Sequence, residues 1–200
     1  MKQLLQINSS LFAGQGQSSQ LTDAFVSRWQ QSHPQTQVSK RDFASEPVPH
    51  LTAESFQAFI TPAQERSAAQ QQAVAYSDHL IDELRQADVI VLGLPMYNFG
   101  VPSQLKAWFD HIARAGVTFK YSETGPVGLL QDKTVYVLAA RGGLYQGTPK
   151  DTQTQYVTDF FNFIGIQDVN FVYAEGLSMG DDARSAALDE AQSDIQRLAA

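Results

Sequence analysis

A short apolar run, residues 89–94 (Val-Ile-Val-Leu-Gly-Leu), predicts the strand around which the rest of the chain is arranged. A continuous apolar run bounded by turn formers is typical of a strand covered on both faces. Because Pro95 has no amide hydrogen to donate, the chain leaves the sheet there and presents Met96, Tyr97, Asn98 and Phe99 beyond the strand's carboxyl end. In open α/β sheets this end binds ligands. The loop suits a planar heterocycle, although its aromatic rings could equally pack underneath the turn.

The hydrophobic pattern elsewhere alternates between strands and amphipathic helices. Further main strands are predicted at residues 4–8, 37–41, 134–140 and 169–174, and a short alternating strand at 117–121. The first predicted helix follows the loop 9–19 and ends at about residue 33, and a short second helix begins after Thr52. A third runs from a capping box at residues 61–64 to about residue 86. Three more are predicted over residues 103–116, 151–165 and 182–198.

This alternation predicts a single α/β domain spanning residues 1–200, a doubly wound five-stranded parallel sheet with helices on both faces. In the strand order 2-1-3-4-5, the carboxyl ends of strands one, three and four are neighbours. The loops after these three strands are therefore expected to converge.

The loop after the first strand, residues 9–19, ends at a helix N-terminus. Free amides and the positive end of the helix dipole attract a phosphate there, and Ser10, Ser18 and Ser19 add hydroxyl donors. No Lys or Arg lies between Lys2 and Arg28, so the donors are expected to be uncharged. A serine-capped loop without a ligand is the alternative. The run from Gly14 to Ser19 resembles a dinucleotide fingerprint, but it begins too far after the strand and lacks the third glycine.

The strand at 134–140 ends in Arg141-Gly142-Gly143, where glycines allow backbone amides to approach a ligand closely. Arg141 could instead be a surface charge.

Composition narrows the function classes. An apolar fraction of 43% with 18% charged residues is ordinary for a globular protein, and a net charge of −7 argues against nucleic acid and anionic membranes as partners. The absence of Cys excludes disulfides and thiolate chemistry. No signal peptide or membrane span is evident at the start or elsewhere, so a cytoplasmic location is expected.

Other chemistries fit less well. Residues 176–180 (Gly-Leu-Ser-Met-Gly) match the hydrolase pattern G-x-S-x-G, but all four histidines precede Ser178, whereas that fold needs one after it. A phosphoacceptor receiver domain would need an Asp where Pro95 and Met96 stand. The histidines show no metal-ligand spacing, so no metal is expected.

With these loops in place, the chain resembles the flavodoxin-like family of FMN-dependent NADH-azoreductases and NAD(P)H:quinone oxidoreductases over essentially its whole length. The resemblance rests on four segments: Ser9-Ser10 with Gln17-Ser18, residues 95–99, residues 114–119 (Arg-Ala-Gly-Val-Thr-Phe) and residues 141–143.

The resemblance implies a bound FMN. Ser10 and Gly16, Gln17 and Ser18 would hold its phosphate, Pro95 and Met96 to Phe99 would line the isoalloxazine, and Ala140 to Gly143 would meet the pyrimidine edge. The family often has Ser where this chain has Ala140, which leaves backbone amides as the donors there. The family also implies a homodimer, in which Phe119, Tyr121 and Phe163 could line the substrate pocket or simply pack within one subunit.

The implied reaction is a ping-pong hydride transfer through FMN from NADH or NADPH to a quinone or an azo compound, with no protein acid–base pair. The flavin carries the chemistry and the protein orients it. A non-enzymatic flavodoxin-like electron carrier is the alternative, for which an acidic chain is also suitable.

Overall fold

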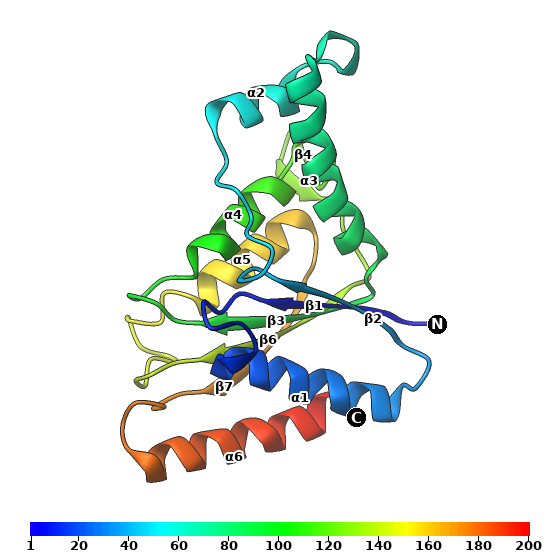
Figure 1. The fold of residues 1–200 in the computed structure, drawn as a ribbon. Helices are drawn as coiled ribbons and strands as arrows, with labels where there is room; N and C mark the ends of the chain where they lie inside the picture. The colour runs from blue at the N-terminus through cyan, green and yellow to red at the C-terminus, as the bar shows by residue number, and fades with distance from the viewer.

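A central parallel sheet lies between two layers of helices (Figure 1) in the computed structural model, which describes residues 1–200. The strands of this sheet are β1 (Gln3–Asn8), β2 (Gln37–Asp42), β3 (Val89–Pro95), β6 (Thr134–Ala140) and β7 (Asp168–Ala174). Their order is β2-β1-β3-β6-β7, with every pair parallel. This is the predicted order 2-1-3-4-5 when only the main strands are counted.

The helices divide between the two faces of the sheet. They are α1 (Gln17–Ser32), α2 (Ala53–Ile60), α3 (Ala68–Gln86), α4 (Ser103–Ile112), α5 (Thr154–Ile164) and α6 (Asp181–Leu198), with short 3-10 turns η1 (Ala13–Gln15) and η2 (Ala63–Glu65). α1 and α6 cover one face, and α3, α4 and α5 cover the other (Figure 1). The segment around α2 projects away from the sheet (Figure 1).

β3 is the middle strand, and all seven of its residues are buried. Because side chains alternate along a strand, Ile90 and Leu92 join the core under α3, α4 and α5, whereas Val89 and Val91 join the core under α1 and α6. Both faces of β3 are therefore apolar, which explains why its sequence is a continuous apolar run rather than an alternating one.

The predicted capping box at Thr61 is wrong. The Thr61 hydroxyl donates to Gln57 O at the end of α2, and α3 begins only at Ala68. Ser67 and Gln70 form the capping box instead, because each side chain bonds the other residue's backbone amide. Two matches to the same pattern lie six residues apart, and the structure uses the second.

Two helix boundaries also differ from the prediction. α4 ends at Ile112 rather than Gly116, since the Thr118 hydroxyl donates to Ile112 O at 2.6 Å and so satisfies the helix end. α5 begins at Thr154 rather than Asp151, and the Asp151 carboxylate accepts the Thr154 amide.

Between α4 and β6 the chain forms an antiparallel hairpin of β4 (Phe119–Ser122) and β5 (Gly125–Gly128). The prediction gave the first strand at 117–121 and took residues 123–126 as a turn only, so it missed the second strand.

Candidate functional site

A cavity of about 260 Å³ lies at the carboxyl edge of the sheet, where β1, β3 and β6 end. Its lining comes from the loops after β1, β3, β6 and β7 and from the first turns of two helices, α1 and α6. The residues are Ser10, Phe12, Gly16, Gln17, Ser18, Pro95, Met96, Tyr97, Ala140, Arg141, Gly142, Leu177, Ser178 and Arg184. The three predicted loops therefore converge on one site.

The loop after β1 is tied down by its serines. The Ser9 hydroxyl donates to Gly93 O on β3 at 2.6 Å. The Ser10 hydroxyl accepts the Phe12 amide at 3.2 Å and lies 3.3 Å from the Tyr97 hydroxyl. Gly16 passes so close to Ser10 that a Cβ on Gly16 would lie 2.1 Å from the Ser10 Oγ. The first loop is thus packed against the second through Ser10, with no room for a side chain at position 16.

The N-terminus of α1 opens onto this cavity without a side-chain cap. Gly16 is the N-cap residue and can offer no side-chain acceptor, so the first amides of α1 are left free. Ser18 is buried and its hydroxyl has no partner in the chain, although it lines the cavity. Free amides with an unpartnered hydroxyl form an anion site at the positive end of the helix dipole.

The loop after β3 is a tight turn in which Tyr97 and Gly100 exchange both backbone hydrogen bonds. The two residues between them, Asn98 and Phe99, have positive φ angles of 50° and 61°. Such a conformation costs about 1–3 kcal/mol for a residue like Phe and persists only when its surroundings enforce it. The buried Gln153 does so, since its amide donates to Pro95 O and Gly100 O, both at 3.0 Å.

In the loop after β6, Gly142 lines the cavity and the side chain of Arg141 is buried within the protein. Arg141 has a fully buried side chain, which bonds Asp151 and Glu175 at 2.9 Å each. Burial raises the pKa of the Asp151 carboxyl, but hydrogen bonds from Arg141 and Thr154 outweigh burial and leave that pKa below its ordinary value. The alternative of Arg141 as a surface charge is wrong. Its backbone lines the cavity, whereas its guanidinium anchors the loop.

Ten of the predicted cofactor-binding residues line the cavity, and three do not. Asn98, Phe99 and Gly143 lie outside its lining. The turn carries Phe99 outward, where it is half exposed and packs edge-on against Tyr145.

The three predicted substrate-pocket residues also lie outside this cavity. Phe119 and Phe163 pack against each other with ring centroids 4.3 Å apart, and Tyr121 is largely exposed beside them. Within one subunit their role is packing.

Sequence reasoning missed Phe12, Leu177, Ser178 and Arg184. The loop after β7 reaches the cavity because the amides of Leu177 and Ser178 donate to the carbonyls of Arg141 and Gly142. The glycines at positions 176 and 180 could have indicated that the loop after β7 approaches a ligand. The sequence pattern there was interpreted only as a possible hydrolase motif. No histidine lines the cavity beside Ser178, so the geometry gives that serine no general base.

The sequence predicts uncharged donors for the phosphate, and the cavity lining also includes Arg184. That expectation considered the loop after the first strand, whereas this guanidinium comes from α6, far along the chain.

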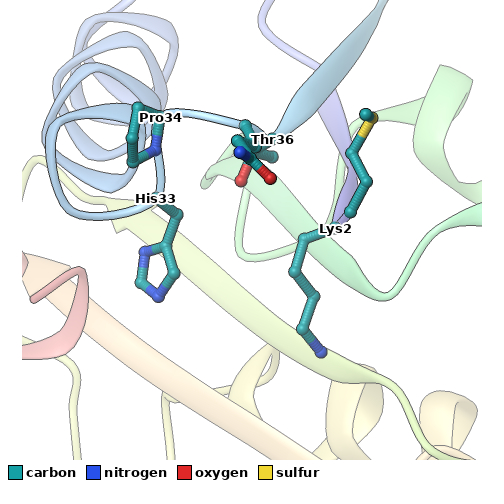
Figure 2. Close-up of a pocket in the computed structure, with 6 residues that line it drawn as sticks. Lys2, His33, Pro34 and Thr36 are labelled. Carbon is teal, nitrogen blue, oxygen red and sulfur yellow. The ribbon is translucent and has the colours of Figure 1, made fainter.

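A second hollow of about 360 Å³ lies at the opposite edge of the sheet, between the start of β1 and the end of α1 (Figure 2). Lys2, His33, Pro34 and Thr36 are among its lining residues. His33 stacks on Trp29 with ring centroids 4.2 Å apart, and so serves packing. No cluster of three or more metal-ligating side chains occurs in the chain, and no helix has the length and apolar character that crossing a membrane requires.

Comparison with known proteins places the geometry in a family. The sequence pattern of the flavodoxin-like fold matches residues 2–199. The chain is 60% identical over 197 residues to an FMN-dependent NADH:quinone oxidoreductase of Cellvibrio japonicus, covering 98% of this chain and 99% of that one. It is 55% identical over 192 residues to a protein of the same name from Alcanivorax borkumensis, covering 96% and 97%.

Solved structures agree with the sequence relatives. An azoreductase from Bacillus anthracis Sterne matches with a TM-score of 0.92 at 27% identity, covering 100% of this chain and 99% of that one. An FMN-dependent NADH-azoreductase from Bacillus anthracis Ames Ancestor, in complex with FMN, matches with a TM-score of 0.88 at 26% identity, covering all of both chains. The chain therefore belongs to the flavodoxin-like family that includes the FMN-dependent NADH:quinone oxidoreductases and NADH-azoreductases.

Proposed function

We propose that this chain is an FMN-dependent NADH:quinone oxidoreductase that also reduces azo compounds. One observation carries the proposal. The N-terminus of α1, which has no side-chain cap, lines the same cavity as the loops that follow β3 and β6. This arrangement occurs in a chain that is 60% identical to an FMN-dependent NADH:quinone oxidoreductase.

The residues at the first loop fit the phosphate of FMN. Ser10, Gly16, Gln17 and Ser18 surround the N-terminus of α1, and the unpartnered Ser18 hydroxyl is a donor that a phosphate oxygen would satisfy. Charge-assisted hydrogen bonds of this kind contribute about 1.5–3 kcal/mol each, against about 0.3–1 kcal/mol for the helix dipole. The donors therefore matter more than the dipole.

The other two loops fit a flat ring system. Pro95, Met96 and Tyr97 form one wall, and Ala140, Arg141 and Gly142 meet it from the neighbouring strand. The amides of Gly142, which lines the cavity, and of Gly143, which lies outside the lining, donate to no other group in the chain, so they are free to bind ring oxygen and nitrogen atoms.

When bound, FMN would supply the hydride and electron chemistry, so the protein needs no acid–base pair. The chain's own contribution is to orient the ring and to stabilise charge on it. We assign the second task to the amides of Gly142 and Gly143 together with Asn98, because fixed donors act without reorganising. Asn98 lies outside the cavity lining of the single chain, so its amide would reach the ring only at the outer rim.

We further propose a cytoplasmic homodimer. Leu11, Phe12, Leu144 and Met179 are large apolar side chains that are mostly exposed, and Phe12 lines the cavity itself. Leu144 and Met179 both lie beside Gly176, so they form one exposed apolar patch that a second subunit would cover. Phe119, Tyr121 and Phe163 would then contact substrate only across that interface. Light scattering in solution should give twice the chain mass of 22.1 kDa.

Steady-state kinetics test the function. Purified protein with FMN should oxidise NADH in the presence of a quinone or an azo dye, with parallel lines in double-reciprocal plots because the two substrates use one cavity in turn. A parallel series with NADPH establishes the nucleotide preference. Absence of NADH oxidation with every acceptor would favour the non-enzymatic electron carrier.

A further inference from the structure

Arg184 occupies a position where the helical pattern of α6 calls for an apolar residue. Ala191 and Ile195 are the buried residues of this helix, and Leu188 packs against the same core. Residue 184 lies four positions before Leu188 and seven before Ala191, so it continues this inward stripe. The stripe thus ends in a half-buried arginine that lines the cavity.

The Arg184 guanidinium is not neutralised within the chain. It makes no ion pair, and its one hydrogen bond is a long contact of 3.5 Å to Leu177 O. Arg141, the other arginine of the lining, is fully paired with Asp151 and Glu175. No carboxylate lines the cavity, although the chain has 21 acidic and only 14 basic residues. An unpaired cation in a site free of acidic groups is suited to an anionic ligand.

Arg184 lines the same cavity as the residues proposed to hold the phosphate. α1 and α6 pack side by side on one face of the sheet, and both begin at its carboxyl edge (Figure 1). The first turn of α6 therefore contributes Arg184 to the same cavity that Gly16, Gln17 and Ser18 line at the N-terminus of α1. The residues proposed to contact the ring system lie instead at the ends of β3 and β6.

We propose that Arg184 binds the phosphate of FMN and makes this chain select FMN over riboflavin. The inference rests on the proposed assignment of this cavity to FMN. The guanidinium would donate charge-assisted hydrogen bonds to the phosphate, in addition to those from the uncharged donors of the first loop. It therefore strengthens binding only of a ligand that carries the phosphate. It is a specificity residue supplied by the last helix rather than by the phosphate loop.

Binding of FMN and of riboflavin to flavin-free protein tests this, with affinity measured by quenching of flavin fluorescence. Arg184→Ala should weaken FMN binding about tenfold to hundredfold, the range expected for one charge-assisted contact. It should change riboflavin binding less than about twofold, and Arg184→Lys should restore part of the FMN affinity because the charge remains. Added salt should also lower the ratio of FMN affinity to riboflavin affinity more in the wild-type protein than in Arg184→Ala.

Arg197→Ala is the matched control. It removes the same charge from the same helix, but Arg197 is exposed, pairs with Asp194 and lies far from the cavity. FMN affinity should be unchanged in this variant. An equal loss of FMN affinity in Arg184→Ala and Arg197→Ala would show that only the net charge of the protein matters, and would overturn the proposal. An unchanged FMN affinity in Arg184→Ala would also overturn it.

Two further outcomes are decisive. A matching loss of riboflavin affinity in Arg184→Ala, with an unchanged melting temperature, would place the guanidinium on the ring rather than the phosphate and overturn the inference. If wild-type protein bound neither flavin, the proposed function itself would fall and this inference with it.

Discussion

Replacing Gly16 with Ala should weaken FMN binding through a steric contact rather than through backbone strain. The backbone at Gly16 has φ −69° and ψ 139°, a conformation that any residue adopts. A Cβ there, however, would lie 2.1 Å from the Ser10 Oγ and 2.6 Å from the Ser10 Cβ. Because the Ser10 Cβ is fixed to the backbone, a rotation of the hydroxyl cannot relieve the contact, and the loop must move.

The magnitude follows from the hydrogen bonds that this movement breaks. Ser10 Oγ accepts the Phe12 amide and pairs with the Tyr97 hydroxyl. Two such bonds contribute about 0.5–1.5 kcal/mol each, so their loss corresponds to roughly tenfold to hundredfold weaker FMN binding. The displacement also moves the first amides of α1 away from the phosphate.

Fluorescence titration of flavin-free Gly16→Ala with FMN measures the effect, and Gly14→Ala is the control. Gly14 lies in the same loop, and a Cβ added there would have no heavy atom within 4 Å, so its substitution should be neutral. Equal FMN affinities in Gly16→Ala and Gly14→Ala would refute the close-approach argument.

Three further predictions concern the loop after β6. Gly142→Val should lower FMN affinity at least about tenfold, since a Cβ at this position would lie 2.9 Å from Ser178 Oγ and the added methyls would fill the cavity; unchanged titration curves would contradict this. Arg141→Met should destabilise the fold by about 3–5 kcal/mol in urea, because it strands the carboxylates of Asp151 and Glu175; a variant as stable as wild type would count against the buried ion pairs. The pKa of Asp151 is lowered on folding, so its stabilisation is complete at neutral pH and is lost as pH falls through and below its ordinary value of 3.8. Urea melts across that range should show the stability gap between wild type and Asp151→Asn closing in acid, and a constant gap would contradict the assignment.

The sheet could be predicted because each main strand has an unambiguous pattern. The apolar run at 89–94 and the run at 134–140 became β3 and β6, and the alternation of strands with helices predicted that the sheet is parallel. Boundaries were less predictable where two signals competed, as with the two capping patterns that begin at Thr61 and Ser67. The choice between them depends on Thr61 bonding to the end of α2, which is a contact and not a pattern.

Parts of the site that depend on tertiary contacts could not be predicted. Phe99 adopts a positive φ that no propensity favours for an aromatic residue, and the buried Gln153 holds the turn from another segment. Arg141 resembled a surface charge because its partners, Asp151 and Glu175, are distant in sequence. Arg184 did leave a local signal, an arginine on the inward stripe of a helix, which becomes meaningful only once the neighbouring helix N-terminus is known.

Anaerobic mixing of the FMN-loaded protein with NADH tests the proposed oxidoreductase activity most directly. We expect rapid loss of the yellow flavin absorbance with NADH alone, and its return when a quinone is added. A flavin that stays yellow with NADH until a partner protein is supplied, or a purified chain that takes up no FMN, would contradict the proposed activity.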